Sequence, residues 1–246
     1  MQLDGKTSIV TGAASGFGAG IARAFAAEGA QVLVADLNGD GAKAIADEIG
    51  GHAVQVDVSN GASVQAMADT ALATFGHLDI LVNNAGITHM PQALEDVTEE
   101  DFDRVLAVNA KSVYLTARAL VPHFKARKAG AILNVASTAG ISPRPRLNWY
   151  NASKGWMITA TKTMAVELAP DGIRVNAINP VAGETPLLKS FMGEDTPETR
   201  AKFLSTIPLG RFSTPQDMGA AATFLCSDAA SMITGVALEI DGGRCI

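Results

Sequence analysis

Tyr150 and Lys154 are the two residues of this sequence best placed for proton chemistry. If both lie on one helix, their four-residue spacing puts them on the same face. A free phenol has a pKa of about 10 and is a poor base at neutral pH. An ammonium group about 5 Å away, at an effective dielectric of about 20, lowers that pKa by about 2 units. The pair therefore predicts a general acid/base, with an inert surface pair as the alternative.

Two polar residues upstream make this prediction more specific. Ser137 closes a strand expected at Ala131–Ala136, so it should lie at the edge of a sheet. Asn109 lies within an otherwise apolar helix expected at Phe102–Phe124. An amide in such a place is unfavourable unless it has a role, such as holding a water. We expect both residues to join the tyrosine and the lysine in one catalytic site.

A glycine-rich loop, Thr11–Gly18, follows the first expected strand and opens a helix. Glycine permits both the sharp turn and the close approach of a ligand, and the helix N-terminus can then hold a pyrophosphate. The spacing is G-x-x-x-G-x-G rather than the common G-x-G-x-x-G, and an ordinary turn is the alternative.

Asp36 supports the nucleotide hypothesis, because it ends the second expected strand 18 residues after Gly18 (36 − 18). A carboxylate there can accept both ribose hydroxyl protons and would repel a 2′-phosphate. No cation in the glycine loop or at Leu37 would attract one, so NAD is favoured over NADP. The alternative is that Asp36 only caps the turn that follows it.

Short β-branched runs alternate with Ala-rich stretches along the chain. Their continuous apolar character is typical of a parallel sheet covered on both faces. The seven expected strands are Thr7–Thr11, Gln31–Asp36, His52–Asp57, Leu78–Asn83, Ala131–Ala136, Ile173–Asn179 and Val236–Ile240. We therefore predict an α/β fold, a doubly wound (Rossmann) seven-stranded parallel sheet with helices on both faces. An eight-repeat barrel is the alternative, which the strand count and the glycine loop disfavour.

The length and composition limit the classes that remain. With 246 residues, 48% of them hydrophobic, and a net charge of -6, the chain is neither disordered nor suited to nucleic acid. No stretch approaches a membrane span, and a strand starting at Thr7 leaves no room for a signal peptide. Cys226 and Cys245 have no metal-ligand spacing. We expect one cytoplasmic domain, 1–246, in which the irregular segment 181–212 forms a substrate loop or lid.

Taken together, the motifs resemble the short-chain dehydrogenase/reductase family over essentially the whole chain. The residues that carry the resemblance are Thr11-Gly12-x-x-x-Gly16-x-Gly18, Asp36, Asp57, Asn83-Asn84-Ala85-Gly86, Asn109, Ser137, Tyr150 and Lys154. One departure is Val181, which stands where the family usually has Gly after Pro180. It places the rim of the substrate site in question, not the reaction class.

The resemblance implies a role for each catalytic residue. Tyr150 would exchange the proton with the substrate oxygen, which Ser137 would orient. Lys154 would hold the nicotinamide ribose and lower the tyrosine pKa, and Asn109 would hold a water that relays the proton. The residues expected to bind the cofactor are Gly12, Ser15, Gly16, Phe17, Gly18, Asp36, Leu37, Asp57, Val58, Asn84, Ala85, Gly86, Tyr150, Lys154, Pro180 and Thr185.

The segment between Ser137 and Tyr150 borders the substrate cleft in the resembled fold. Its residues Arg144 and Arg146 could clamp a carboxylate, phosphate or sulfonate, or could instead face solvent or another subunit. His89 and Met192 are further candidate lining residues. The resemblance also implies a homotetramer.

The sequence thus predicts an NAD-dependent oxidoreductase that acts on a secondary alcohol, polyol or hydroxy acid. Its partner would be a small alcohol or carbonyl compound, with an anionic one allowed. A carbonyl or 3-oxoacyl thioester reductase is the alternative within enzymes. A non-catalytic NAD-binding sensor is the alternative from another class, although such a protein would usually lack the tyrosine or the lysine.

Overall fold

Seven parallel strands form one sheet at the centre of the computed structural model, which describes all 246 residues. The strands are β1 Thr7–Thr11, β2 Gln31–Asp36, β3 His52–Gln55, β4 Ile80–Asn83, β5 Gly130–Val135, β6 Ile173–Pro180 and β7 Ala237–Ile240. Their order is β3-β2-β1-β4-β5-β6-β7, so the chain reverses its direction of winding between β1 and β4. Ligands of open α/β sheets bind at the carboxyl ends of the strands beside such a reversal.

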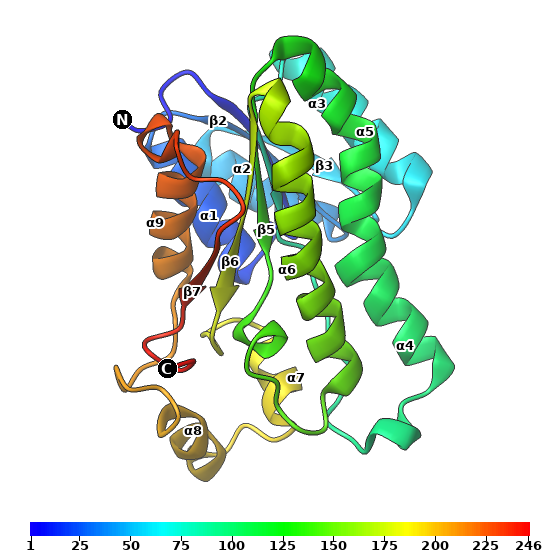
Figure 1. Cartoon of the computed structure of the whole chain (residues 1–246), viewed down its shortest axis with the longest axis vertical. Coiled ribbons are helices and arrows are strands. Elements are labelled where there is room, and N and C mark those ends of the chain that lie inside the picture. Colours follow the sequence, from blue (N-terminus) through cyan, green and yellow to red (C-terminus); the bar gives the residue numbers. More distant parts are fainter.

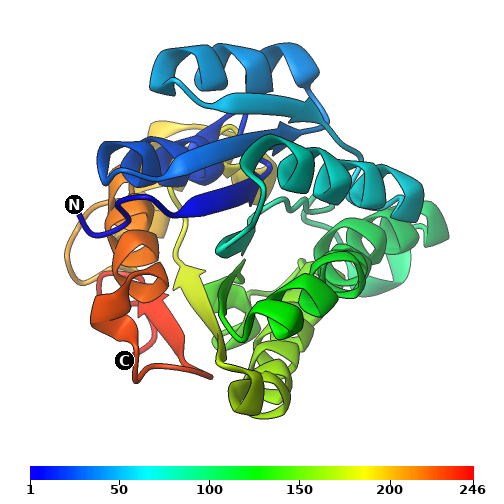
Figure 2. The same cartoon turned by 90° about the horizontal axis from the view of Figure 1, so that it is seen from above.

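Helices cover both faces of the sheet (Figures 1 and 2). They are α1 Gly16–Ala27, α2 Gly39–Ile49, α3 Gly61–Phe75, α4 Glu99–Leu106, α5 Ser112–Arg127, α6 Asn148–Leu168, α7 Leu188–Met192, α8 Pro197–Leu204 and α9 Pro215–Cys226. One core cluster packs α1, α2 and α9 against the sheet, and a second packs α3, α5 and α6 against the other face. The predicted doubly wound fold is confirmed. None of these helices combines the length and the hydropathy that a membrane crossing needs.

The strand boundaries agree with the sequence prediction to within two residues. β3 is shorter than predicted, because the backbone N–H of Asp57 donates to the Ser63 hydroxyl and the chain turns toward α3. β3 is an edge strand that pairs only with β2, so nothing on its outer side continues the ladder.

The apolar helix predicted at Phe102–Phe124 is interrupted by a π-helical turn, Ala107–Lys111, between α4 and α5. Such turns insert an extra residue into a helix and occur often at functional sites. Asn109 lies at the middle of this turn and is completely buried.

The segment 181–212 is more regular than its Gly and Pro content predicted, because it carries α7 and α8. Pro197 opens α8 at its first turn, and the Thr196 hydroxyl caps it by accepting from the N–H of Thr199. Val181 is buried in a small apolar cluster with Leu188, and this cluster joins the segment to the body of the protein. The valine that departs from the family pattern therefore has a packing role.

Candidate active site

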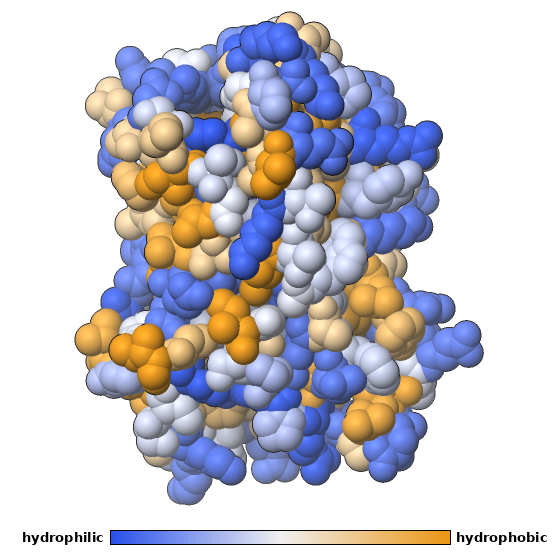
Figure 3. Space-filling view, viewed as in Figure 1, coloured by the Kyte–Doolittle hydropathy of each residue, from blue (hydrophilic) through white to orange (hydrophobic).

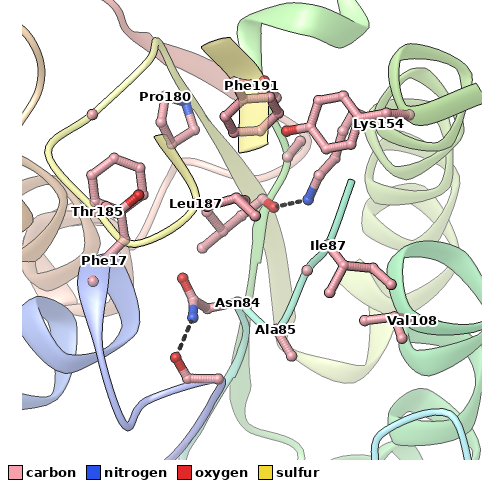
Figure 4. A pocket seen from close by; sticks show the side chains of 18 of the residues that line it. Phe17, Asn84, Ala85, Ile87, Val108, Lys154, Pro180, Thr185, Leu187 and Phe191 are labelled. Carbon is pink, nitrogen blue, oxygen red and sulfur yellow. Dashed lines mark hydrogen bonds between the residues drawn. The ribbon is translucent and has the colours of Figure 1, made fainter. Parts of the chain in front are cut away.

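A cavity of about 520 Å³ lies at the carboxyl edge of the sheet, within the range of ligand sites in proteins. Its walls come from the glycine loop, the ends of β2 to β6, the start of α6 and the segment 181–212. Figure 4 shows Thr185, Leu187 and Phe191 of that segment on the side of the cavity opposite Ala85 and Ile87.

The glycine loop is closely packed against the loop after β4. Gly12 and Gly16 have φ values of 64° and 55°, which favour glycine. A Cβ on Gly18 would collide with the Gly12 carbonyl oxygen and with Asn84 Nδ2. Asn84 Nδ2 donates to the carbonyl oxygens of Thr11 and Gly12 at 2.8 and 3.0 Å, and one of these two bonds is drawn in Figure 4. These contacts fix the loop in the shape that the cavity requires.

The N-terminus of α1 opens toward this cavity. Ser15 is its N-cap residue, yet the side chain of Ser15 makes no capping hydrogen bond, and no acidic residue lies in the first turn. Ser15, Gly16 and Phe17 all line the cavity. Unsatisfied N–H groups and the positive end of the helix dipole suit an anionic ligand such as a pyrophosphate.

Asp36 has a structural role in addition to the one predicted for it. Its carboxylate oxygens accept from the backbone N–H groups of Ala14 and Asn38, both at 2.9 Å. The side chain thus holds the glycine loop and the turn after β2 together while it lines the cavity. Capping a turn and facing a ligand are compatible, because each carboxylate oxygen has a further lone pair.

Tyr150 and Lys154 lie on α6 as predicted, and both are buried. Lys154 Nζ donates to the carbonyl oxygen of Val135 at 2.9 Å and lies 6.0 Å from the centroid of the Tyr150 ring. Burial raises the pKa of Tyr150 to about 12, against the opposing effects of the Ser137 hydroxyl and the Arg144 charge. The prediction that Lys154 lowers this pKa is therefore wrong for the protein alone. The loss of hydration of the phenolate outweighs the neighbouring charges.

Burial also lowers the pKa of Lys154, to about 8. At neutral pH most of the lysine is still protonated, so a cation remains beside a protonated phenol. This state is ready to give a proton to a carbonyl oxygen. The reverse reaction requires additional positive charge near Tyr150 to bring its pKa down.

Asn109 does not use its side chain as predicted. Its Oδ1 accepts from the N–H of Ile87 at 2.9 Å, and its Nδ2 donates to the Ile87 carbonyl at 2.9 Å and the Ser153 hydroxyl at 3.0 Å. Both amide protons are thus satisfied by protein groups rather than by a water. The asparagine ties the loop after β4 to α6, which explains a polar residue inside an apolar helix.

The cavity gathers the predicted cofactor residues with one exception. Gly18 lies outside the lining, where it supports the loop. Ser137 also lines the cavity, and its Oγ accepts from the N–H of Ala139 at 3.1 Å. The lining residues that were predicted are Gly12, Ser15, Gly16, Phe17, Asp36, Leu37, Asp57, Val58, Asn84, Ala85, Gly86, Tyr150, Lys154, Pro180 and Thr185.

Of the four predicted substrate residues, only Arg144 lines the cavity. His89 is buried below the surface of the loop, with Nδ1 bonded to the Met90 carbonyl oxygen at 2.8 Å. Arg146 is exposed, and its guanidinium donates to the carbonyl oxygen of Pro91. Met192, the last residue of α7, packs against the apolar cluster that contains Val181 and Leu188. These three placements correct the sequence prediction, which had no information on which way each side chain points.

Two aromatic residues of the cavity wall were missed. Phe191 on α7 meets the Tyr150 ring edge to face, with centroids 5.0 Å apart (Figure 4), and Phe203 on α8 lies beneath Arg144. A signal was present, because both are large apolar residues within a segment otherwise rich in polar residues, Gly and Pro.

Replacing Lys154 by Met should raise the free energy of unfolding at pH 7 by about 2 kcal/mol and abolish turnover. The lysine pKa falls from 10.5 to about 8 on burial. The lysine therefore binds its proton more tightly in the unfolded state than in the folded state. This difference lowers the free energy of unfolding by about 3 kcal/mol, and the effect is fully present below pH 8. Loss of the bond to Val135 offsets about 1 kcal/mol.

This stability gap should narrow as the pH rises from 8 toward 10.5, because the unfolded lysine then loses its proton too. Urea unfolding at pH 7 and 9.5 measures it. Lys162→Met, on the exposed part of α6, is the matched control and should change the free energy of unfolding by no more than about 0.5 kcal/mol. A gap that does not depend on pH would refute the explanation.

Comparison with known proteins places this site among oxidoreductases. A family profile described as enoyl-(acyl carrier protein) reductase matches residues 12–244. The 4-formylbenzenesulfonate dehydrogenase TsaC1/TsaC2 of Comamonas testosteroni is 52% identical over 99% of both chains. The D-threitol dehydrogenase of Mycolicibacterium smegmatis is 42% identical over 100% of this chain and 95% of its own length. The crystal structure of a 3-ketoacyl-(acyl-carrier-protein) reductase from Brucella melitensis, complexed with NADH, superposes with a TM-score of 0.95, at 53% identity over 99% of this chain and 100% of that one.

Proposed function

This chain belongs to the short-chain dehydrogenase/reductase family, and we propose that it transfers a hydride between an alcohol, polyol or hydroxy acid and NAD, with Tyr150 as general acid/base. The observation that carries the proposal is the single cavity in which Tyr150, Lys154 and Ser137 share a wall with the glycine loop and Asp36. The residues expected to transfer the proton and those expected to bind the nucleotide thus line the same cavity.

The residues present fit a nicotinamide dinucleotide. The uncapped N-terminus of α1 suits the pyrophosphate, and Asp36 suits the adenosine ribose. Pro180, Thr185 and Lys154 also line the cavity and would hold the nicotinamide end, with Thr185 next to Gly16 of the glycine loop. When bound, the nicotinamide ring supplies the hydride acceptor or donor.

The chain's own residues handle the proton and the orientation of the substrate. In reduction, the neutral phenol of Tyr150 gives its proton to the carbonyl oxygen, which the Ser137 hydroxyl orients. In oxidation, Tyr150 takes the hydroxyl proton, and the Ser137 hydroxyl and the positive charge of Arg144 favour the phenolate that must exist first. Asn109 keeps α6 in register with the loop at Ile87 and so acts as a positioning residue. A water that relays the proton from Lys154 past Asn109 would be held by groups other than the Asn109 amide protons, which are both engaged.

The substrates named for the relatives agree with this proposal. One name combines a carbonyl group with a sulfonate on a benzene ring, and another is a polyol. A sulfonate or a carboxylate would complement Arg144, the cation in the cavity wall. We therefore propose an anionic alcohol or carbonyl compound ahead of a neutral polyol.

A carbonyl or 3-oxoacyl thioester reductase is the second candidate. It is favoured by the match to a family described as a reductase and by the similar 3-ketoacyl reductase structure. Asp36 argues against the NADPH that such reductases commonly use. The rates of the two reactions separate the two candidates: faster oxidation of free alcohols favours the dehydrogenase, and faster reduction of 3-oxoacyl thioesters favours the reductase. If neither reaction occurs, the NAD-binding sensor is the candidate that is left.

We expect Asp36→Ala to narrow the preference for NAD over NADP by at least about tenfold in kcat/KM. The variant removes both the acceptor for the ribose hydroxyls and the charge that repels a 2′-phosphate. Initial rates of cofactor reduction with the best alcohol of a panel of polyols, hydroxy acids and sulfonated alcohols measure this. Asp40→Ala, nearby at the start of α2, is the control. A wild type that prefers NADP would overturn the cofactor assignment.

We extend the proposal to a cytoplasmic homotetramer. Apolar side chains remain exposed on α6, with Trp156 44% and Val166 79% accessible, and apolar patches lie around α6 and α9 in Figure 3. A helix that is apolar on a second face favours a second packing partner. Cys226 and Cys245 are both unpaired thiols, which suits a reducing compartment.

A further inference from the structure

The guanidinium of Arg144 has no protein counter-ion. It lines the cavity, no carboxylate oxygen lies within 4.0 Å of it, and it donates no hydrogen bond to the protein. Its backbone is nevertheless fixed, since the Arg144 carbonyl oxygen accepts from Asn151 Nδ2 at 2.7 Å. Its guanidinium carbon lies 4.2 Å from the centroid of the Phe203 ring. A partly buried arginine that has no counter-ion in the protein is suited to bind an anionic ligand.

A second arginine, Arg244 of the C-terminal tail, lies close to the first. Its Nη1 donates to the Ser142 hydroxyl at 3.2 Å, and its Nε is buried without any partner. The nearest acid in sequence, Asp241, is engaged elsewhere, because its carboxylate accepts from the backbone N–H groups of Gly243 and Cys245. The tail is thereby folded so that Arg244 reaches a loop about one hundred residues upstream.

The two arginines repel each other. After burial itself, the charge of Arg244 is the largest effect that lowers the pKa of Arg144. Like charges brought together away from water are unfavourable unless an anion joins them. Among the groups that partly compensate Arg144 are the side chains of Tyr150 and Cys245, and both are weak acids. The pair therefore lacks a full negative charge.

We infer that Arg144 and Arg244 form an anion subsite at the substrate end of the cavity, which selects substrates bearing a fixed carboxylate or sulfonate on a flat apolar body. The inference rests on the proposed function and names its substrate class. Arg144 contacts the anion directly, and Arg244 is a positioning residue that adds charge from behind the Ser142 loop. The flat body is accommodated by Phe191, which packs on Tyr150, and by Phe203, which supports Arg144.

The position of Arg144 favours a substrate anion over a phosphate of the cofactor. Its charge acts on the phenol of Tyr150, so it lies at the catalytic end of the cavity rather than beside the glycine loop. A substrate with a rigid ring that is bound at both of its ends would hold its reacting carbon in one position. Both ends of such a substrate, the hydroxyl at Tyr150 and the anion at Arg144, would then have a defined partner.

Three alcohols of one shape test this inference: 4-(hydroxymethyl)benzenesulfonate, 4-(hydroxymethyl)benzoate and the neutral 4-(hydroxymethyl)benzamide. The wild type should oxidise at least one anion with a KM at least about tenfold below that of the amide. Arg144→Gln should raise the KM for that anion at least about tenfold and leave the KM for the amide within about twofold, while the lost charge beside Tyr150 lowers kcat for all three alcohols alike. Arg244→Gln should act in the same direction but less. A lower KM for the sulfonate than for the benzoate, or the reverse, identifies the anion.

Arg146→Gln is the matched control, because this arginine lies two residues along the same segment and outside the cavity. It should leave all three KM values within about twofold. Titration with NADH should give unchanged cofactor binding in every variant, which excludes a cofactor phosphate as the anion. Since Arg144 loses only its contact with the Phe203 ring, and no ion pair or hydrogen bond, its variant should also keep the melting temperature within a few degrees of the wild type.

Binding of benzenesulfonate, measured by calorimetry with NADH present, reports the subsite without turnover, and Arg144→Gln should weaken it about tenfold. If Arg144→Gln raised the KM values of the anions and of the amide by equal factors, the proposed anion subsite would be wrong. So would a wild type that oxidises neutral alcohols and neither binds benzenesulfonate nor prefers the anions. Failure of the wild type to oxidise any alcohol, with benzenesulfonate still bound, would overturn the proposed function instead.

Discussion

Tyr150→Phe should lower kcat for alcohol oxidation at least about 10³-fold while NADH binding stays within about twofold. The variant removes only the phenolic O–H. The ring remains to pack against Phe191, with its centroid 5.0 Å away, and Lys154 keeps its bond to the Val135 carbonyl oxygen. In oxidation the phenolate oxygen of Tyr150 takes the hydroxyl proton of the substrate, and a phenylalanine ring has no atom that can accept it. Stopped-flow and steady-state rates of NAD reduction measure the effect.

Tyr114→Phe is the matched control, because Tyr114 is the other tyrosine of the chain, exposed on α5. It should leave kcat unchanged. Ser137→Ala should reduce kcat less than the Tyr150 variant, since it removes the group that orients the substrate oxygen and not the proton donor. Turnover by Tyr150→Phe within tenfold of the wild type would refute the acid/base assignment.

Gly18→Ala should weaken cofactor binding at least about tenfold and lower the free energy of unfolding by about 1–3 kcal/mol. The new Cβ would collide with the Gly12 carbonyl oxygen and with Asn84 Nδ2. Relief of that collision breaks the bonds by which Asn84 holds the loop at Thr11 and Gly12. The loop then moves out of the shape that presents the N-terminus of α1. Fluorescence titration with NADH and urea unfolding measure the two effects.

Gly155→Ala provides the matched control in another helix interior. Its Cβ would find its nearest neighbour, the Gly140 carbonyl oxygen, at an ordinary 3.6 Å. The helix propensity of alanine should then stabilise α6 by up to about 1 kcal/mol. If Gly18→Ala bound NADH as tightly as this control, the close packing of the loop would have no bearing on the cofactor.

The sequence predicted those parts of the structure that depend on local pattern. The strands β1 and β2 have the predicted bounds, because buried parallel strands appear as continuous apolar runs bounded by Gly and Asp. The glycine loop, Asp36, Ser137, Tyr150 and Lys154 line one cavity as predicted, since the carboxyl ends of parallel strands share an edge.

The sequence could not predict what depends on tertiary surroundings. The pKa of Tyr150 was predicted to fall and instead rises, because burial is set by neighbours such as Phe191 that are distant in the chain. Arg144 and Arg146 have the same residue type and similar flanking prolines, yet only the first lines the cavity. Arg244 approaches the site from a tail that no local pattern connects with it.

The most direct test of the central claim is deuterium transfer to the cofactor. The wild type is incubated with NAD and an alcohol of the panel that carries deuterium on the hydroxyl-bearing carbon, and the reduced cofactor is analysed by mass spectrometry and NMR. We expect one deuterium on C4 of the nicotinamide ring, at a rate that Tyr150→Phe lowers at least about 10³-fold. Absence of deuterium from the cofactor, or equal transfer by the Tyr150 variant, would contradict it.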